Sequence, residues 1–365
     1  MVRWAMVVCY TGGGTLGHVY PALAVHEELE GEYGYSAFFI GRKDRTEQQA
    51  VEAAGLMFHA IPSGKLRRYR SKRNLIDPLF VFAGFLSSLW ILITHRSDVL
   101  FSKGGFVTPP VVLAAWILRI PIVSHESDAT PGLATRINSR FSRVLCTPFA
   151  SGFEHLGVKK IVATGSPVRK RLLDYRRGSA TVDFLGDGEL LLLILGGSSG
   201  SQTINDLVYA TLDEITAAAH VYHQCGRGNG KAVEHSRYTQ VEFIDEQMAP
   251  LLERADLVVS RAGANTIAEL ALFGAPALLI PLSAAYSRGD QIDNARHLEQ
   301  NGCARVLYGE IDRETFADVV RSLLEDGEAR RALSDSIAGL GKPESASLIA
   351  DQVREQGRKR SCSGE

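Results

Sequence analysis

The sequence predicts an α/β protein built from two doubly wound, Rossmann-like domains. Short apolar segments alternate with longer helix-patterned segments along the 365 residues, as parallel strands alternate with crossover helices. A glycine-rich turn follows an apolar segment in each half of the chain, at residues 12–17 and 196–201. A chain of 365 residues is also long for a single domain.

Six apolar segments in the first half are expected to be buried parallel strands. They are residues 4–10, 36–41, 58–62, 98–105, 121–126 and 144–148, with helix-patterned segments at 20–31 and 109–119. The 15 apolar residues Leu79–Ile93 are expected to form a largely buried helix. At 1.5 Å per residue they reach about 22 Å, which is short of the roughly 30 Å core of a bilayer.

The second half repeats this pattern. Its expected strands are residues 189–201, 220–226, 241–245, 256–263, 276–281 and 304–308. Apolar periodicity fades between residues 165 and 189, so the first domain is expected to span 1–167 and the second 168–342. A helix at about 343–358 is expected to pack back on the first domain, followed by a frayed polar tail at 359–365.

Charge is distributed unevenly between the two halves. Residues 1–177 contain 23 Lys and Arg against 13 Asp and Glu, whereas the remainder contains 17 against 28. The basic first half is therefore expected to face something anionic: nucleic acid, an anionic membrane surface or a pyrophosphate lipid. Uneven surface charge without a function is the alternative.

The cysteines predict neither disulfides nor a metal site. Cys9, Cys146, Cys225, Cys303 and Cys362 are widely scattered and have no metal-ligand spacing. Four of them lie in or beside apolar segments, which predicts buried free thiols.

The first glycine turn has the spacing G-x-G-x-x-G at Gly12, Gly14 and Gly17, and His18 follows it directly. Such turns let backbone N–H groups approach a phosphate, and the helix that follows adds partial positive charge. Comparable strand ends occur at 104–105, 196–201 and 262–264. A diphosphate held between the facing strand ends of two domains is the expected ligand.

A dinucleotide-binding domain is an alternative interpretation of the same turn. It requires an acidic residue at the end of the second strand to bind the ribose hydroxyls. Here that strand is followed by Arg42 and Lys43. An NADP-dependent oxidoreductase, which could use Arg42, therefore stays open.

Eight segments resemble, in order, the motifs of one enzyme family. They are GGGTLGHVYPALA, SKGGFVTPPVVLAAW, PIVSHESDATPGLATRIN, GSPVR, GGSSGSQTIND, FIDEQM, RAGANTIAEL and SRGDQIDNA, between about residues 5 and 305. The family is the inverting GlcNAc transferase of bacterial peptidoglycan synthesis (MurG). The resemblance implies the GT-B arrangement, in which two doubly wound domains face each other across a cleft.

The resemblance also implies the reaction and its partners. GlcNAc would pass from UDP-GlcNAc to the 4-hydroxyl of a lipid-linked MurNAc-pentapeptide, converting lipid I to lipid II. The first domain would bind the acceptor and the membrane, and the second would bind UDP-GlcNAc. The enzyme would be peripheral, at the cytoplasmic face of an anionic inner membrane, with no cofactor, no metal and no nucleic-acid partner.

The resemblance assigns site residues on the acceptor side. His18 is the first candidate for the base that takes the acceptor proton, because imidazole titrates near neutrality. Helix capping or orientation of the loop is the alternative role of His18. Glu126 is the second candidate, with His125 beside it. The expected phosphate loops contain Gly12, Gly13, Gly14, Gly104 and Gly105.

Further residues follow for the donor and the membrane. Glu269 would accept hydrogen bonds from the ribose hydroxyls, since a carboxylate accepts two. The other expected donor contacts are Thr15, Gly17, Asp128, Arg169, Ser198, Ile244, Ala264, Asn265, Thr266 and Gln291. Asp128 stands where the family often has Asn, and Leu16 where a glycine is frequent. The expected membrane patch comprises Leu75, Ile76, Leu79, Phe80 and Trp116, beside the basic residues of 65–73.

Two other functions fit the same two-domain plan. A nucleotide-sugar epimerase would act on UDP-GlcNAc without a lipid acceptor. The basic first half and the apolar stretch Leu75–Phe85 would then have no purpose. A membrane recruiter from a split transferase would carry only half of the motifs, whereas this chain carries both halves.

Overall fold

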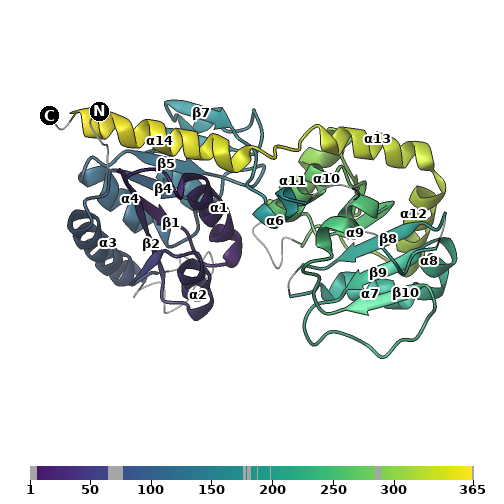
Figure 1. Ribbon diagram of the computed structural model, residues 1–365. Coiled ribbons are helices and arrows are strands. Elements are labelled where there is room, and N and C mark those ends of the chain that lie inside the picture. Colours follow the sequence, from purple (N-terminus) through teal and green to yellow (C-terminus); the bar gives the residue numbers. More distant parts are fainter. Residues whose placement is uncertain are drawn as a thin grey trace. The chain divides into compact units, whose positions relative to one another are not determined.

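The computed structural model describes residues 6–64, 77–175, 178, 182–186, 188–197, 199–283 and 289–363. It divides into two compact units (Figure 1). Unit 1 comprises Met1–Arg169 and Pro343–Glu365, and unit 2 comprises Lys170–Lys342. The expected boundary after residue 167 falls two residues before this division. Leu75, Ile76, Ser198 and the basic segment 65–73 lie outside the described residues.

Unit 1 contains a seven-stranded parallel sheet with the order β3-β2-β1-β4-β5-β6-β7. Its strands are β1 (Met6–Thr11), β2 (Tyr35–Arg42), β3 (Met57–Ile61), β4 (Val99–Ser102), β5 (Ile122–His125), β6 (Val144–Thr147) and β7 (Lys160–Ala163). The central strands are buried on both faces, which explains their continuous apolar sequence. The edge strand β7 was not predicted, because its sequence KIVA is short and partly exposed.

Helices cover both faces of this sheet. They are α1 (Tyr20–Leu29), α2 (Arg45–Ala53), α3 (Asp77–Thr94), α4 (Thr108–Ile117) and α5 (Leu133–Asn138), with short 3-10 helices η1 (Leu16–His18) and η3 (Glu154–Leu156). Asp44 caps α2 by accepting hydrogen bonds from the backbone N–H groups of Thr46 and Glu47. Prolines in the first turn start α1 and α4.

The C-terminal helix α14 (Ser345–Ser363) belongs to unit 1, where it packs against α1 and β4 (Figure 1). Ile349, Ala350 and Val353 join the core beside Val8 and Val99. The helix ends at Ser363, five residues beyond the end expected from the sequence. No proline interrupts the sequence that extends it.

The expectation that residues 79–93 form a largely buried helix is wrong. They lie within α3, of which only 28% is buried. Gly84 and Ser88 face the unit, whereas Leu79 and Trp90 are each 68% exposed. The exposed apolar residues Leu79, Phe82, Leu86, Trp90 and Ile93 recur at intervals of three or four, so they form one stripe along the helix. Composition alone does not reveal that only one face of the helix is covered.

Length and composition would allow α3 to cross a membrane, and it is the one such helix in the described part of the chain. Its buried face, however, packs on α4 and β3 as the crossover between β3 and β4. Gly84 lies so close to the loop after β3 that a Cβ there would clash with the Pro62 carbonyl oxygen. This packing holds α3 as a surface helix of unit 1.

Unit 2 contains a six-stranded parallel sheet with the order β10-β9-β8-β11-β12-β13. Its strands are β8 (Leu191–Leu195), β9 (His220–Gln224), β10 (Tyr238–Val241), β11 (Leu257–Ser260), β12 (Ala277–Leu279) and β13 (Arg305–Val306). The expected strand at 241–245 begins three residues earlier, because Tyr238 is the buried residue and Phe243 is exposed.

The helices of unit 2 are α6 (Lys170–Leu173), α7 (Gln202–Ala210), α8 (Leu212–Ala218), α9 (Met248–Arg254), α10 (Ala264–Phe273), α11 (Asp290–Gln300), α12 (Arg313–Glu325) and α13 (Gly327–Ala338). Ser201 caps α7 by accepting a hydrogen bond from the Ile204 N–H. Gly274 ends α10 in the left-handed conformation. Cys225 and Cys303 in this unit, and Cys9 and Cys146 in unit 1, are buried free thiols, which confirms that prediction.

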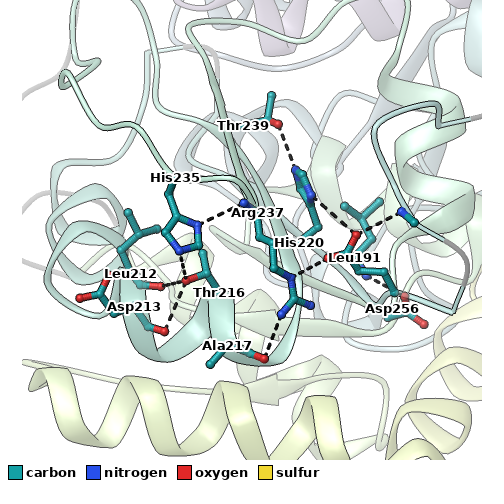
Figure 2. Close-up of polar contacts among 12 residues, drawn as sticks. Leu191, Leu212, Asp213, Thr216, Ala217, His220, His235, Arg237, Thr239 and Asp256 are labelled. Carbon is teal, nitrogen blue, oxygen red and sulfur yellow. Dashed lines mark hydrogen bonds and ion pairs between the residues drawn. The ribbon is translucent and has the colours of Figure 1, made fainter.

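At the amino edge of each sheet, an aspartate accepts a hydrogen bond from a backbone N–H of the neighbouring strand. Val7 N donates to Asp98 Oδ2 in unit 1 and Leu191 N donates to Asp256 Oδ2 in unit 2, both at 2.8 Å. In unit 2 a larger polar network surrounds this contact, including His220 and Arg237 (Figure 2). Because ligands of doubly wound sheets bind at the carboxyl edge, we assign this network to stability.

Candidate active site

The strand order of each sheet reverses at one point, which is where doubly wound proteins bind ligands. In unit 1 it lies between β1 and β4, and in unit 2 between β8 and β11. The predicted turns at 12–17, 104–105 and 196–201 follow β1, β4 and β8, and the predicted turn at 262–264 follows β11. The fold therefore brings the predicted loops together in pairs, one pair in each unit.

The two glycine loops of unit 1 are packed directly against each other. Lys103 N donates to the Thr11 carbonyl at 2.9 Å, which ties the ends of β1 and β4 together. A Cβ on Gly105 would clash with the Gly13 carbonyl oxygen, and a Cβ on Gly12 would clash with the His18 carbonyl oxygen. Gly13 and Gly104 have positive φ angles of 151° and 86°. Larger residues cannot take these places.

His18 ends the 3-10 helix η1, with its backbone N–H donating to the Thr15 carbonyl at 3.0 Å. The half-buried imidazole lies against the second glycine loop, since His18 Cδ2 is 3.2 Å from the place a Gly105 Cβ would take. His18 therefore touches both loops of unit 1. Thr15 and Gly17, which were expected to contact the donor, belong to the same turn.

Glu126 follows β5 and anchors the loop that comes after it. Its Oε1 accepts from Ser127 N at 2.8 Å and from Asp128 N at 3.2 Å. Its Oε2 accepts from Gly132 N at 3.0 Å and from Thr135 Oγ1 at 2.6 Å. Both oxygens of this buried carboxylate are engaged, so the geometry favours anchoring over the second expected role, that of a base.

His125 is also tied into the fold rather than presented to a ligand. It is buried, and its Nε2 lies 2.9 Å from the Gly165 carbonyl oxygen. Burial holds the pKa of His125 well below its usual value, and the positive charge of Lys103 lowers it further. The imidazole is therefore neutral near pH 7.

Lys103, which follows β4 and immediately precedes Gly104, was not predicted as a site residue. Only 2% of this lysine is exposed, and its Nζ donates to Ser127 Oγ at 2.6 Å. Burial lowers its pKa, while the carboxylates of Glu126 and Asp128 raise it. A lysine next to a glycine pair at a strand end was the available signal, because such a position adds positive charge to a phosphate loop.

In unit 2 the loop after β8 turns through Gly197 and Gly200, with φ angles of 84° and 76°. Gln224, at the end of β9, joins this loop to the next. Its Nε2 donates to the Gly197 carbonyl at 2.9 Å, and its Oε1 accepts from Ile244 N at 2.9 Å. Gln224 was not predicted as a site residue, because its two partners lie on loops that are distant in the sequence.

The turn after β11 leads into α10 and carries most of the expected donor residues. Gly263 precedes the helix, and Ala264, Asn265 and Thr266 form its half-buried first turn. Glu269, also half-buried, follows Thr266 by three residues and therefore lies on the same face. The first turn of a helix presents unpaired N–H groups suited to an anion.

Gln291 and Arg169 lie on other segments. Gln291, in the first turn of α11, accepts a hydrogen bond from Leu282 N at 2.9 Å. Arg169 ends the first segment of unit 1 and is half-buried. Among the described residues, no three His, Cys, Asp or Glu side chains form a group that could hold a metal ion.

Family models match both units of the chain. The N-terminal domain of glycosyltransferase family 28 matches residues 8–145, and the C-terminal domain of the same family matches residues 191–352.

Curated relatives match nearly the whole chain. A protein of Clostridium kluyveri is 43% identical over 307 residues, covering 83% of this chain and 86% of the relative. A protein of Legionella pneumophila is 39% identical over 355 residues and covers 96% of each. Both are named UDP-N-acetylglucosamine--N-acetylmuramyl-(pentapeptide) pyrophosphoryl-undecaprenol N-acetylglucosamine transferase.

Solved structures agree with these matches. The crystal structure of Acinetobacter baumannii MurG superposes with a TM-score of 0.77 at 25% identity, covering 96% of this chain and 99% of that one. The UDP-GlcNAc 2-epimerase of Neisseria meningitidis has a TM-score of 0.69 at 11% identity, covering 96% and 100%. The second likeness extends to the fold alone.

Proposed function

The chain belongs to glycosyltransferase family 28, as a UDP-GlcNAc-dependent N-acetylglucosaminyltransferase that converts lipid I to lipid II, and we propose how its residues divide this reaction. The observation that supports the proposal most is the 39% identity to the Legionella pneumophila relative over 96% of the chain. The matched region includes the glycine loops at the strand-order reversals of both sheets. Unit 2 binds the donor, and unit 1 binds the acceptor and supplies the base.

On the donor side, Glu269 accepts hydrogen bonds from the two ribose hydroxyls of UDP. The loop after β8 and the amide groups of Ala264, Asn265 and Thr266 hold the diphosphate at the amino end of α10. These donors are fixed by the fold, so they stabilise the charge of departing UDP without rearrangement. Ser198 and Arg169 assist at the phosphates.

The remaining donor contacts recognise the uracil ring and the GlcNAc sugar of the donor. Ile244 faces uracil through its backbone, and Gln224 fixes that backbone by accepting its N–H. Gln291 binds GlcNAc hydroxyls, and Asp128, Thr15 and Gly17 are the other proposed donor contacts. The Gln291 carboxamide suits this task because it both donates and accepts.

On the acceptor side, the paired glycine loops hold the pyrophosphate of lipid I. Gly12–Gly14 and Gly104–Gly105 let the backbone approach the phosphates. Lys103 places a buried positive charge behind these loops. The charge acts in a region of low dielectric, where its attraction for a phosphate is stronger than in water.

His18 takes the proton of the MurNAc 4-hydroxyl. The oxygen then attacks C1 of GlcNAc from the face opposite UDP, so the configuration at C1 inverts. Imidazole accepts a proton near pH 7 without a large pKa shift. Support comes from its position against both glycine loops, and from the four hydrogen bonds that already occupy Glu126.

The enzyme associates peripherally with an anionic membrane through α3. The exposed apolar stripe of that helix, defined above, is the surface that enters the lipid interface, together with Phe80 on α3 and Trp116 on α4. An apolar helix face held by a folded unit lies in the interface without spanning it. This arrangement gives the enzyme access to a lipid-bound acceptor.

Release of UDP tests this function. Purified protein is mixed with UDP-GlcNAc, with and without a soluble lipid I analogue, and UDP is measured. We expect release only when the acceptor is present, because the acceptor hydroxyl is the nucleophile. Acceptor-independent release, or formation of UDP-ManNAc, would instead indicate a hydrolase or an epimerase.

A further inference from the structure

We propose that Glu47, on α2, is a positioning residue of the acceptor site, which orients the glycine loop of unit 1 and through it His18. The inference rests on the proposed function of that site. None of the sequence motifs includes Glu47, and the proposed function gives it no direct contact with either substrate. Three contacts connect it to His18.

The first contact joins Glu47 to the glycine loop. Glu47 is only 3% exposed, and its Oε1 accepts a hydrogen bond from Gly14 N at 2.7 Å. The residues lie 33 positions apart, so a helix from beyond β2 supports the turn after β1. A buried carboxylate is costly unless hydrogen bonds offset its desolvation, so this contact constrains where the side chain lies.

The second contact joins the two glycine loops. The Gly14 N–H and the Gly13 C=O belong to one trans peptide group and point in opposite directions. Because Glu47 holds the N–H, the Gly13 carbonyl faces the other way. That carbonyl oxygen meets the Gly105 backbone so closely that a Cβ there would clash with it. Glu47 thus sets which face of the peptide meets the second loop.

The third contact reaches the imidazole. His18 Cδ2 lies 3.2 Å from the place of a Gly105 Cβ, and the His18 carbonyl lies directly against Gly12. A rotation of the 13–14 peptide would therefore displace Gly105 and remove the surface on which the ring rests. Small displacements of a reacting group are sufficient to lower a catalytic rate substantially.

The other oxygen of Glu47 takes no part in the contact with Gly14, which needs one acceptor oxygen. Oε2 is buried without a hydrogen-bond partner among the described residues and lies 3.0 Å from the place of a Gly13 Cβ. Burial raises the pKa of Glu47, and Asp44 raises it further, while the Gly14 N–H and Arg42 lower it. A glutamine oxygen can accept the same Gly14 hydrogen bond.

Steady-state kinetics of Glu47→Ala and Glu47→Gln test the proposal, with Glu52→Ala as the matched control. Glu52 is an exposed residue of the same helix. We expect Glu47→Ala to lower kcat about tenfold to a hundredfold, with a much smaller change in the donor KM. Glu47→Gln should restore most of this loss, and Glu52→Ala should behave as wild type.

A double-mutant cycle with His18→Ala separates positioning from general weakening of the fold. If Glu47 acts through His18, Glu47→Ala should cost less than threefold in kcat once His18 is alanine, since interacting residues are not additive. Additive losses, or equal changes in donor and acceptor KM, would overturn the proposal. So would a Glu47→Ala enzyme with wild-type kinetics.

An NMR measurement reads the same contacts without activity. In the amide spectrum, Glu47→Ala should shift the resonances of Gly14 and Gly105, and the ring resonances of His18 should move with them. Glu52→Ala should leave all three in place. Unmoved Gly105 and His18 signals would refute the positioning role even if the wild type transferred GlcNAc. Shifted signals in a protein without transfer activity would refute only the proposed function.

Discussion

The contacts of two carboxylates and one histidine around the loops of unit 1 indicate different roles. Glu126 accepts four bonds and Glu47 accepts one from a glycine amide, so both are occupied in holding loops. His18 instead has its ring against the glycine loops that we assign to the acceptor pyrophosphate. Its residue type and its position both suit a base.

Substitution of His18 and Glu126 should therefore have different effects. His18→Ala should lower kcat by about 10²–10⁴-fold with nearly unchanged donor affinity, since this is the usual contribution of a positioned base. Glu126→Gln should instead destabilise the protein by about 1–3 kcal/mol, because an amide NH₂ cannot accept the bonds of Oε1 or Oε2. Kinetics and thermal unfolding of both variants measure this. A loss below threefold in His18→Ala would leave it a structural residue.

The ribose contact is tested at Glu269. Glu269→Ala should weaken UDP-GlcNAc binding by about 1.5–3 kcal/mol, because hydrogen bonds to a charged acceptor are lost. Isothermal titration calorimetry measures the affinity. Glu314→Ala, which removes an exposed carboxylate from α12, serves as the control. Equal affinity in folded Glu269→Ala would remove this residue from the donor site.

At the scale of elements, helix α3 has two faces with different tasks. One packs on α4 and β3, and the other carries the exposed apolar stripe. Burying a large apolar side chain is worth about 1.5–3 kcal/mol, so an exposed stripe of five such residues needs a partner surface. We propose that the lipid interface is this partner surface, since the acceptor is a lipid.

Liposome flotation tests the role of α3. The triple variant Leu79→Ser, Phe82→Ser and Trp90→Ser should bind anionic liposomes at least about tenfold more weakly, because much of the apolar contact is removed. Binding of the wild type should also fall with salt, since electrostatic attraction contributes. Tyr308→Ser, at an exposed residue of unit 2, is the control. Wild-type protein that stays unbound at low salt would contradict the proposal.

Strand β9 makes unit 2 sensitive to acid through His223. Burial lowers the pKa of His223 to about 4, and its ring nitrogens meet Tyr238 and Asn205. The imidazole is neutral in the folded protein, whereas the unfolded chain takes up a proton below about pH 6.5. The stabilisation is therefore complete above this pH and is lost as the pH falls toward 4.

Between pH 7 and pH 5 this linkage should remove about 2 kcal/mol from the free energy of unfolding of the wild type. His223→Gln should lack that portion of the pH dependence, although it is less stable at pH 7. Denaturant unfolding at the two pH values measures the difference. An equal loss of unfolding free energy in the wild type and in His223→Gln would show that His223 does not contribute to the pH dependence.

At the scale of the whole molecule, sequence patterns predicted the two parallel sheets and the glycine loops at their reversal points. An apolar segment followed by glycine is a local signal, so it can be recognised in the sequence without knowledge of tertiary contacts. Composition did not predict which face of α3 is covered, since that depends on the packing of β3 and α4. Glu47 and Gln224 were missed because each is a single polar residue with partners in distant loops.

The most direct test of the account is the fate of the donor sugar. Radiolabelled UDP-GlcNAc and a lipid I analogue are incubated with the enzyme, and the lipid product is isolated and examined by NMR. We predict one labelled GlcNAc per lipid, joined to the MurNAc 4-hydroxyl in the β configuration. His18→Ala should form this product at least about 10²-fold more slowly. Label that stays in water-soluble sugar, or a product with the α configuration, would contradict the account.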